Sequence, residues 1–439
     1  MNLKSKKKNV SVFYNCTGCR VLKNSLSLSI LALLIPNTHL NAQQQISFPR
    51  RVILNLTETP STSVAVNWQS STETVQGVVQ YTQAKANPEF EDEIKAIYAQ
   101  QETITYTDDD TKKDTTLKFC SATIENLSPS TEYMYRVGDS INWSEWLQFK
   151  TAGTPGDKYS FIYFGDAQND IKSKWSRVIR QAFMTCPDAG FLYHAGDLIN
   201  HDHSTKEWDD WFYAGGFIHA MVPSVMTPGN HEYGKGMILD PQWDAQFNLP
   251  KNGPEDHKER VYYSDYNNLR IISLDADLMD ESDESLETQK KWLENVLSNN
   301  PQKWTVLTLH FPFYSTKENR DNAKLRENFK PLVDKYGVDL VLTGHDHAYG
   351  RGMHEIESSI PGQKSNTMYV VSVSGPKMYT ISDKSWMKKK AADTQLYQVV
   401  DIDNNTLLYR AYTATGVLFD SFKLVKKKQG KNILTEFKN

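Results

Sequence analysis

Between residues 159 and 342, short apolar runs alternate with stretches of helical character. The runs are rich in β-branched and aromatic residues and are bounded by polar segments, which is typical of buried strands. Strands that alternate with helices form parallel sheets covered by helices, so this region is predicted to fold as an α/β domain. The predicted strands are 159–164, 191–194, 222–226, 269–274, 304–309 and 339–342, and the predicted helices are 174–184, 287–297 and 324–336.

Two later stretches, 368–373 and 396–425, are strand-rich and have no helical segment between them. We expect them to complete a mixed sheet in a domain of residues 153–425, followed by a basic tail, 426–439, that is frayed and solvated. Hydrophobic residues at 39% and charged residues at 23% exclude a disordered chain and a polytopic membrane protein. A net charge of −4 argues against a partner that is a nucleic acid, because nucleic-acid binders have a basic excess.

Residues 43–152 show the period-2 alternation of strands separated by turns, for example at 64–68. The segment 127–137 contains Leu-x-Pro-x-Thr-x-Tyr, a turn in which the hydroxyl of Tyr133 can bond back to the upstream backbone. The region resembles a fibronectin type III-like β-sandwich, so we expect a separate all-β domain with a linker at 153–156. Its expected role is to position its neighbour, and binding of a carbohydrate or a partner is the alternative.

The first 42 residues contain six Lys or Arg and no Asp or Glu, and an apolar run at 26–35 precedes Ala42. These are the parts of a secretory signal peptide, so residues 1–42 are predicted to be removed and the protein to be secreted or periplasmic. The run is shorter than the roughly 20 residues of a membrane span, so no stable span is expected, and an uncleaved amphipathic tether is the alternative. After removal Cys120 and Cys186 would remain, and two unpaired thiols are favoured over one bridge.

Five polar motifs follow directly after predicted strands of the α/β domain. Ligand sites in open α/β sheets form at the carboxyl ends of strands, so these motifs are expected to meet. A single Gly-Asp pair at a strand end is usually a turn, but five such motifs in order are hard to ascribe to chance. The motifs are Gly165-Asp166-Ala167-Gln168, Gly196-Asp197-Leu198-Ile199-Asn200, Gly229-Asn230-His231-Glu232, His310, and Gly344-His345-Asp346-His347.

These motifs resemble those of the calcineurin-like metallophosphoesterases, and among them the purple acid phosphatases. The resemblance covers residues 159 to about 425, and the β-sandwich is similar to the N-terminal domain of plant and bacterial purple acid phosphatases. It implies a two-domain fold, in which an αββα sandwich follows the β-sandwich, and two metal ions at the strand ends. Carboxylate and imidazole ligands suit Fe, Zn or Mn, and two ions about 3.5–4 Å apart need a bridging ligand such as a carboxylate.

The resemblance also implies a role for each matching residue. His231 would face the substrate, where it stabilises phosphoryl oxygens or protonates the leaving group, and a purely structural hydrogen bond is the alternative for this residue. The neutral Asn230 would add an oxygen ligand without adding charge. By the same resemblance Asp197 bridges the ions, Asp166 and His347 hold the first ion, and Asn230, His310 and His345 hold the second.

Three positions depart from the purple acid phosphatase pattern. Asn200 stands where that family has the tyrosine whose phenolate binds ferric iron, so a colourless protein is predicted. Gln168 stands where the family has Gly, and its amide oxygen is a further candidate ligand of the first ion. Arg320 lies near the position where plant enzymes have a His pair and is a candidate phosphate clamp, with a solvated loop residue as the alternative.

Other polar and aromatic residues near the motifs receive plainer interpretations. His201 and His203 are expected to form a polar rim loop, and a ligand or substrate contact is the alternative. Trp208, Trp211 and Phe212 recur at helical spacing and are expected to be a packed face. The acidic stretch 277–287 is expected to be a solvated loop.

The leading hypothesis is an exported dinuclear-metal phosphoesterase that hydrolyses phosphate monoesters by attack of a metal-activated water. A phosphodiesterase or nucleotide hydrolase on the same metal core is the alternative, and a non-catalytic surface-binding protein is a third hypothesis. The expected partner is a small phosphorylated substrate. No pattern in the sequence bears on the oligomeric state.

Overall fold

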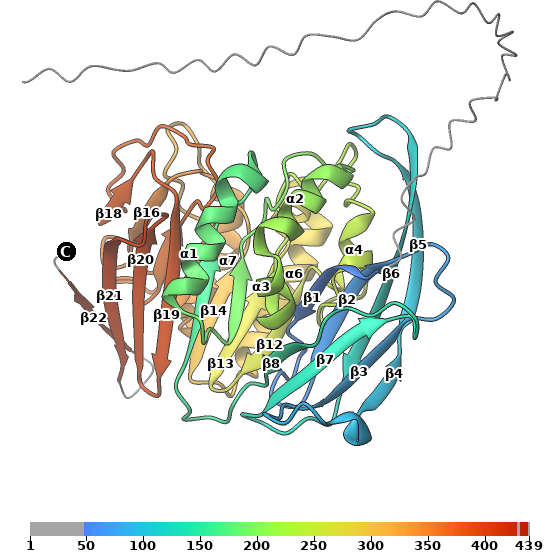
Figure 1. Ribbon diagram of the computed structural model, residues 1–439. Coiled ribbons are helices and arrows are strands. Elements are labelled where there is room, and N and C mark those ends of the chain that lie inside the picture. Colours follow the sequence, from blue (N-terminus) through green and yellow to red (C-terminus); the bar gives the residue numbers. More distant parts are fainter. Residues whose placement is uncertain (1–47, 428–430, 438–439) are drawn as a thin grey trace, which may run out of the picture. The chain divides into compact units, whose positions relative to one another are not determined.

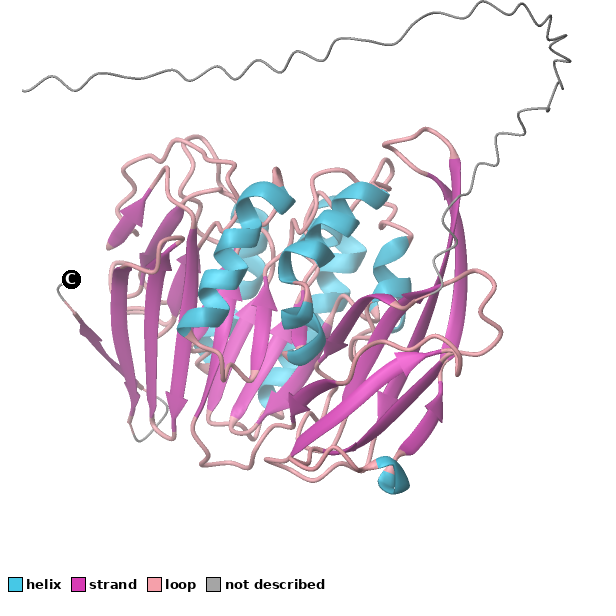
Figure 2. Ribbon diagram, in the orientation of Figure 1, coloured by secondary structure: helices cyan, strands magenta, loops and turns pink. Residues whose placement is uncertain are grey.

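The computed structural model describes residues 48–427 and 431–437, and its strands are gathered in three sheets (Figures 1 and 2). The predicted signal peptide, residues 1–42, lies outside the described residues. Within the described residues, no helix is long and apolar enough to cross a membrane.

The largest sheet has eleven strands: β1 (Arg50–Asn55), β2 (Val64–Ser70), β5 (Gln100–Thr107), β6 (Asp114–Ile124), β9 (Tyr159–Phe164), β10 (Phe191–His194), β11 (Ser224–Met226), β19 (Leu396–Asp403), β20 (Thr406–Thr413), β21 (Leu418–Lys426) and β22 (Asn432–Glu436). Their order is β22-β21-β20-β19-β9-β10-β11-β1-β2-β6-β5. Strands β9, β10 and β11 are parallel, and β19 to β22 add to them antiparallel. The sheet crosses from the N-terminal region into the α/β region, because β1 pairs in parallel with β11, Asn55 opposite Ser224.

The second sheet has seven strands: β12 (Tyr262–Tyr266), β13 (Leu269–Ser273), β14 (Trp304–Thr308), β15 (Leu340–Thr343), β16 (Tyr349–Gly352), β17 (Met368–Val371) and β18 (Lys389–Ala391). Strands β13, β14, β15 and β17 are parallel, and β12, β16 and β18 run antiparallel to their neighbours. The two sheets face each other, since the hydroxyl of Tyr262 on β12 donates a hydrogen bond of 2.7 Å to the carbonyl of Met226 on β11.

Helices cover the outer faces of both sheets. Buried side chains of α1 and α2 join the core of the first sheet, and those of α5, α6 and α7 form a second core against the other sheet. The predicted αββα sandwich is therefore confirmed. The helices are α1 (Ser176–Thr185), α2 (Thr205–Gly215), α3 (Phe217–Met221), α4 (Gln242–Gln246), α5 (Ala276–Glu281), α6 (Asp283–Ser298) and α7 (Ala323–Tyr336), with a π-helical turn, η2 (Ile171–Trp175), before α1 and 3-10 turns at η1 (Glu91–Glu93) and η3 (Glu255–His257).

The N-terminal region is a β-sandwich, as predicted. Its four-stranded sheet packs on β1, β2 and β6 around Trp68 and Tyr135, which are buried. The backbone N–H of Ser128 donates to the hydroxyl oxygen of Tyr133 over 2.9 Å, the back-bond expected from the turn motif. The strands of this sheet are β3 (Val78–Gln83), β4 (Lys95–Tyr98), β7 (Glu132–Gly138) and β8 (Leu147–Lys150).

The six predicted strands between residues 159 and 342 are confirmed to within two residues at each end. The predicted helix at 287–297 begins earlier, at Asp283, because the side chain of Ser282 caps it by accepting from the N–H of Ser285. Cys120 and Cys186 are unpaired, as predicted.

Two local predictions are wrong. The stretch 277–287 is not a solvated loop, because α5 and the start of α6 occupy it and Asp277 is only 3% exposed. Met279 of the same helix packs in the second core, so the helix that contains Asp277 lies against the protein interior. In the C-terminal tail, residues 432–436 are not frayed, because β22 pairs with β21 along its whole length.

Candidate metal centre

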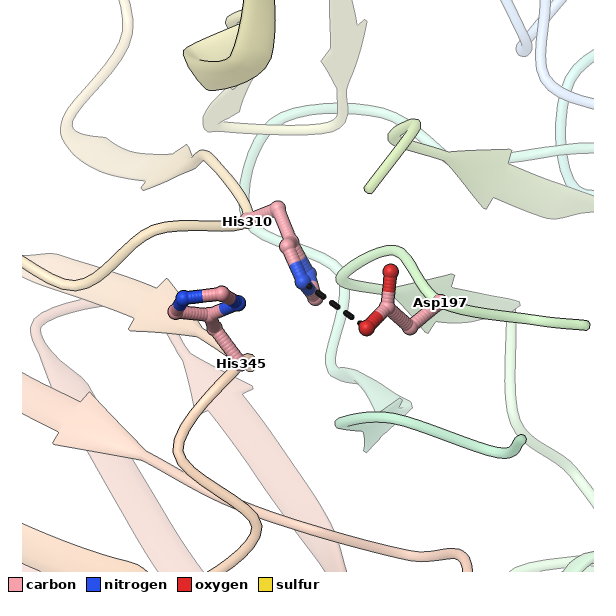
Figure 3. Close-up of side chains that lie close together, drawn as sticks. All are labelled: Asp197, His310 and His345. Carbon is pink, nitrogen blue, oxygen red and sulfur yellow. Dashed lines mark ion pairs between the residues drawn. The ribbon is translucent and has the colours of Figure 1, made fainter. Parts of the chain in front are cut away.

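The predicted motifs meet where the two sheets end. Asp166 follows β9, Asp197 follows β10 and Asn230 follows β11, so the eleven-stranded sheet supplies the first three motifs. The seven-stranded sheet supplies His310 after β14, and the segment from His345 to His347 after β15. Figure 3 shows Asp197, His310 and His345 converging from these loops. The carboxyl ends of parallel strands are the usual place for a ligand site in such sheets.

The loops hold their functional side chains in uncommon backbone conformations. Asp197 has a φ of 52°, His345 of 72° and His347 of 45°, all in the left-handed region. Glycine is required nearby, since a Cβ on Gly344 would lie 2.3 Å from a carboxylate oxygen of Asp166. A Cβ on Gly229 would lie 2.4 Å from Oδ1 of Asp197. Strain of this kind persists only where the surroundings fix it, and it gathers at functional sites.

Asp197 belongs to two groups of potential ligand atoms. It forms one group with His310 and His345 and another with Asp166 and His347, and within each group the atoms lie within 4.8 Å of one another. Asp166, Asp197, His310 and His347 are all at most 2% exposed. Among residues 48–427 and 431–437, the carboxylate of Asp197 is therefore the side chain that belongs to both groups, which is the position of a bridging ligand.

The imidazoles are oriented by hydrogen bonds from their far nitrogens. Nδ1 of His310 donates to the carbonyl of Ala195 over 2.8 Å, and its Nε2 lies 3.1 Å from Oδ2 of Asp197. Nδ1 of His347 donates to the carbonyl of Lys377 over 3.2 Å, and its Nε2 lies 3.3 Å from Oδ2 of Asp166. Each ring thus keeps Nε2 turned toward a carboxylate, which is how metal-binding histidines are held.

The charges in the centre favour bound cations. Burial raises the pKa of Asp166 to about 7, with the nearby Asp197 adding to the rise. Burial alone would lower the pKa of His310, but the carboxylate of Asp197 raises it well above its ordinary value. Burial also lowers the pKa of His347 to about 3 and that of His345 well below its ordinary value, so both rings are neutral at pH 7, the form that binds metals.

Three buried ligand atoms lack a hydrogen bond of suitable geometry among the described residues, although the first and the last have the ion-pair contacts given above: Oδ2 of Asp166, Oδ1 of Asn230 and Nε2 of His310. An unpaired buried polar atom costs about 1–3 kcal/mol, so a group of them at one point calls for a ligand. Oδ2 of Asp166 and Oδ1 of Asn230 are electron-pair donors, and Nε2 of His310 becomes one when a bound cation displaces its proton. Oxygen and imidazole nitrogen together suit Fe, Zn or Mn. The residues present therefore fit a pair of metal ions.

Gln168 lies in the centre, but its amide is turned away from the predicted arrangement. Its Nε2 donates to Oδ2 of Asp197 over 2.7 Å, and its Oε1 accepts from Nζ of Lys377 at 3.4 Å. The amide oxygen therefore faces Lys377, and a ligand role would require the amide to turn over. In this orientation Gln168 holds the shared carboxylate in place.

His231 lies beside the centre and is partly open to solvent. Its Nδ1 donates to the carbonyl of Asn200 over 2.6 Å, and its backbone N–H donates to Oδ1 of Asp197 over 3.0 Å. Its Nε2 lies 4.0 Å from Oδ2 of Asp197, and 26% of the side chain is exposed. This places one free ring nitrogen at the mouth of the centre.

Arg320 is engaged within the protein. Its Nη1 forms an ion pair of 2.6 Å with the buried Asp346 and donates to the carbonyl of His345 at 3.3 Å. Arg320 therefore braces the loop that carries His345 and His347. A clamp on a substrate phosphate remains a prediction that competes with this contact.

Glu232 has a positioning role that the sequence interpretation did not give it. Its carboxylate accepts four backbone N–H groups, from Asp197, Leu198, Ile199 and Gly229, at 2.7–3.2 Å. Burial and the charge of Asp197 raise its pKa to about 8, and the backbone donors oppose that rise. Glu232 is the last residue of the third motif. Its role could not be predicted, because a carboxylate that binds backbone N–H groups has no characteristic sequence pattern.

The remaining residues lie as expected. His201 is exposed and its Nδ1 pairs with Glu207, while His203 pairs with Asp202, so both belong to the rim. Trp208 and Trp211 are fully buried and Phe212 is 6% exposed, which confirms the packed face.

The comparisons with known proteins follow the same division of the chain. Residues 49–151 match the family model of the purple acid phosphatase N-terminal domain, and residues 159–349 match that of the calcineurin-like phosphoesterases. Residues 159–349 are therefore a calcineurin-like phosphoesterase domain. Together with the domain before it, this gives the chain the domain arrangement of the purple acid phosphatases.

Several relatives of this chain share the arrangement at low identity. Acid phosphatase type 7 of Danio rerio is 25% identical over 354 residues, which cover 70% of this chain and 77% of that protein. Probable inactive purple acid phosphatase 1 of Arabidopsis thaliana is 24% identical, covering 70% of this chain and 57% of that protein. An uncharacterized protein of Mycobacterium tuberculosis is 28% identical, covering 55% and 52%. The chain thus spans about half to three quarters of the length of these curated relatives.

Solved structures of phosphoesterases show the same fold. The purple acid phosphatase PPD1 from yellow lupin seeds superposes with a TM-score of 0.71 at 19% identity, covering 88% of this chain and 75% of that one. PhoD superposes with a TM-score of 0.64 at 14% identity, covering 89% and 92%.

Proposed function

We propose that this phosphoesterase hydrolyses phosphate monoesters with two metal ions held at the strand ends, and that residues 1–42 direct its export. The observation that carries the proposal is the position of Asp197, whose carboxylate belongs to both groups of ligand atoms. A site for one ion would need no shared carboxylate, whereas two ions in one centre do.

The proposed ligand set is divided between the sheets. Asp166 and His347 would hold one ion, and His310, His345 and Asn230 the other, with Asp197 between them. When bound, such ions supply a Lewis acid for the phosphoryl oxygens and acidify a water molecule that can attack phosphorus. Neutral His345 and His347 and the neutral amide of Asn230 bind without adding negative charge, which leaves the centre attractive to a phosphate ester.

His231 is the proposed catalytic residue. Its Nδ1 proton is committed to the carbonyl of Asn200, so Nε2 is the atom that faces an incoming ester. From there it would hold a phosphoryl oxygen when neutral, or donate a proton to the departing alkoxide when protonated. A general acid contributes most to substrates with poor leaving groups, so its loss should affect alkyl phosphates more than p-nitrophenyl phosphate.

Some relatives bear the name "probable inactive", so the proposed activity depends on which ligand residues this chain itself contains. The six proposed ligand residues are all present at the strand ends. Asn200 replaces the phenolate ligand, and its amide contacts His201 at 2.9 Å. We therefore propose Mn, Zn or Fe(II) as the resident ions.

The test is the substitution Asp197→Ala beside Asp197→Asn, with Glu284→Gln as a control that removes an exposed carboxyl. Metal content by elemental analysis and hydrolysis of p-nitrophenyl phosphate should fall together in the first variant and stay at wild-type level in the control. Full turnover with the Asp197→Ala protein would overturn the proposal. Cleavage of bis(p-nitrophenyl) phosphate alone would replace the monoesterase with a diesterase.

Export is tested separately by mass spectrometry of the protein recovered outside the cytoplasm of the producing cells. A chain that begins near residue 43 supports the signal peptide. An intact chain that stays inside the cells would overturn it.

A further inference from the structure

Three cationic side chains surround Tyr379 at the edge of the metal centre. Nζ of Lys317 lies 4.2 Å from the centroid of the Tyr379 ring, and Nζ of Lys377 lies 5.7 Å from it. Cζ of Arg320 lies 6.0 Å from the same centroid. Lys317 and Arg320 come from one segment and Lys377 from a later one, and the ring of Tyr379 brings the two segments together through cation–π contacts.

This group is attached directly to a proposed metal ligand. The Tyr379 ring packs edge-on against His347 with centroids 4.6 Å apart, and the N–H of Tyr379 donates to the carbonyl of His347 over 3.1 Å. The carbonyl of Lys377 accepts from Nδ1 of His347, and the ammonium of Lys377 reaches Gln168 at 3.4 Å. The cations therefore lie next to the half of the centre formed by Asp166 and His347.

Two of the three charges are not neutralised by the protein. Arg320 is paired with Asp346, but neither Lys317 nor Lys377 forms an ion pair with any carboxylate among residues 48–427 and 431–437. Both side chains are half-buried, which strengthens their field relative to that of a fully solvated lysine. In a chain with a net charge of −4, two uncompensated ammonium groups at one rim form a local anion site.

We propose that Lys317, Lys377 and Tyr379 form a subsite for a second phosphoryl group, so that the preferred substrates carry one beside the phosphoryl group that is cleaved. The proposal rests on the function proposed above and names its substrate class. A lysine ammonium binds phosphate as a point charge, and the ring of Tyr379 holds both ammonium groups on the side of His347.

The test compares ADP with AMP, which contain the same nucleoside and differ in one phosphoryl group. Release of phosphate from ADP breaks an anhydride bond and AMP leaves, whereas release from AMP breaks an ester bond and adenosine leaves, so the comparison is made between protein variants on each substrate. Initial release of inorganic phosphate gives kcat/KM for each with the wild type, Lys317→Met, Lys377→Met and the double variant. Lys335→Met is the matched control, because Lys335 pairs with Glu294 on the surface of α7. One charge-assisted hydrogen bond corresponds to about a tenfold change in kcat/KM.

Each lysine variant should lose about tenfold more in kcat/KM on ADP than on AMP, because only ADP carries a second phosphoryl group beside the one that is cleaved. Equal losses on both substrates, or no loss on either, would overturn the subsite. If no variant and no wild-type protein releases phosphate from either substrate, the proposed function fails and not the subsite alone.

A different set of contacts links the N-terminal domain to His231. The hairpin of β5 and β6 reaches the start of α2, where Oδ2 of Asp110 accepts from Oγ of Ser204 over 2.7 Å and from the N–H of Lys206 over 3.2 Å. Oδ2 of Asp108 accepts from the N–H of Thr205 over 3.1 Å. Two carboxylates from the β-sandwich thus cap a helix of the other domain.

The capped helix in turn holds the loop behind His231. Ser204 accepts from the N–H of Glu207 over 3.0 Å, and the carboxylate of Glu207 accepts from the N–H groups of Asn200 and His201 over 2.5 and 3.0 Å. The carbonyl of Asn200 is the acceptor for Nδ1 of His231. Hydrogen bonds through Ser204, Glu207 and Asn200 therefore connect Asp110 to the ring of His231.

We infer that Asp110 is a positioning residue for His231, and that the N-terminal domain acts on catalysis through it. Asp110→Ala should lower kcat for an alkyl phosphate about fivefold, with a smaller loss on p-nitrophenyl phosphate. Asp110→Asn keeps an acceptor oxygen and should restore most of the loss. Asp114→Ala, on the same hairpin but bonded only to Thr107, is the control.

A double-mutant cycle with His231→Ala decides the inference. If Asp110 acts through His231, adding Asp110→Ala to His231→Ala should cost nothing further in kcat. An equal fold loss in both backgrounds would overturn the coupling, and so would failure of Asp110→Asn to restore activity.

Discussion

Two groups of buried histidines in the described part of the chain have opposite surroundings. His310 and His347 lie among carboxylates, and each has one nitrogen bonded to a backbone carbonyl. His194 at the end of β10 and His219 on α3 lie among aromatic rings, where His219 stacks on Trp211 of α2 with centroids 4.0 Å apart. Neither ring nitrogen of His194 has a hydrogen-bond partner among the described residues.

The difference shows what makes a buried imidazole a ligand. A bond from one nitrogen fixes the ring and leaves the other nitrogen facing a carboxylate, which is the arrangement at the strand ends. Among aromatic rings the same side chain acts as a flat packing group, and burial lowers the pKa of His219 to about 3. Residue type and burial are equal in the two places, so the partners decide the chemistry.

The largest expected contrast is in activity. His310→Ala should lower phosphatase activity by more than about a hundredfold, because it removes a ligand and the partner of Asp197. His219→Phe should stay within about twofold, because the ring lies in the aromatic layer. Initial rates with p-nitrophenyl phosphate, measured with metal in excess, test both. Comparable losses in the two variants would mean that the aromatic layer takes part in the centre.

The next contrast is in stabilisation by metal. Ligands that bind only the folded chain stabilise it by about 4 kcal/mol at a thousand times their dissociation constant, so chelation should lower the melting temperature of the wild type by several degrees. The shift should persist in His219→Phe and shrink in His345→Ala. Calorimetry with and without EDTA measures it, and an undiminished shift in His345→Ala would remove that residue from the ligand set.

The free energy of unfolding in acid should depend on His219, which lies in the aromatic group. The pKa of His219 is about 3 in the fold and about 6.5 in an unfolded chain, so only the unfolded chain takes up this proton in that window. Stability therefore falls as the pH falls from about 6.5 toward 3, and this contribution is constant above 6.5. The full loss approaches about 5 kcal/mol, at about 1.4 kcal/mol for each pKa unit.

His219→Phe should remove much of this slope in urea unfolding of the metal-free protein between pH 7 and pH 4. The exposed His354, replaced by Gln, should leave the slope unchanged. An equal slope in wild type and His219→Phe would show that the aromatic layer does not keep the ring neutral.

The smallest expected signal is optical. With Asn200 in place of a phenolate ligand, the metal-loaded protein should be colourless at visible wavelengths, even when loaded with iron. An absorption spectrum before and after reduction checks this. A strong visible band would show that another phenolate, such as that of Tyr379 beside His347, reaches the metal.

Much of the centre could be predicted from the sequence, because Asp166, Asp197 and His310 each follow an apolar strand and strand ends converge in an α/β sheet. Lys377 follows β17 in the same way, but a lone lysine after a strand is too common to single out. Asp277 could not be predicted as buried, since the charged groups near it include His310, Asp197 and Glu232, which are distant in the sequence. Local sequence patterns predict strands and motifs. The pairing of distant segments depends on packing, which local patterns do not contain.

The sharing of one sheet by the two domains is a case of such pairing. Strand β1 is bonded to β2 on one side and to β11 on the other, and Leu56 continues the link with a backbone bond of 3.1 Å to Ser224. A protease that cuts at residues 153–156 would therefore release no free domain. The two fragments would stay together as one noncovalent particle, held by a β-sheet that both of them complete.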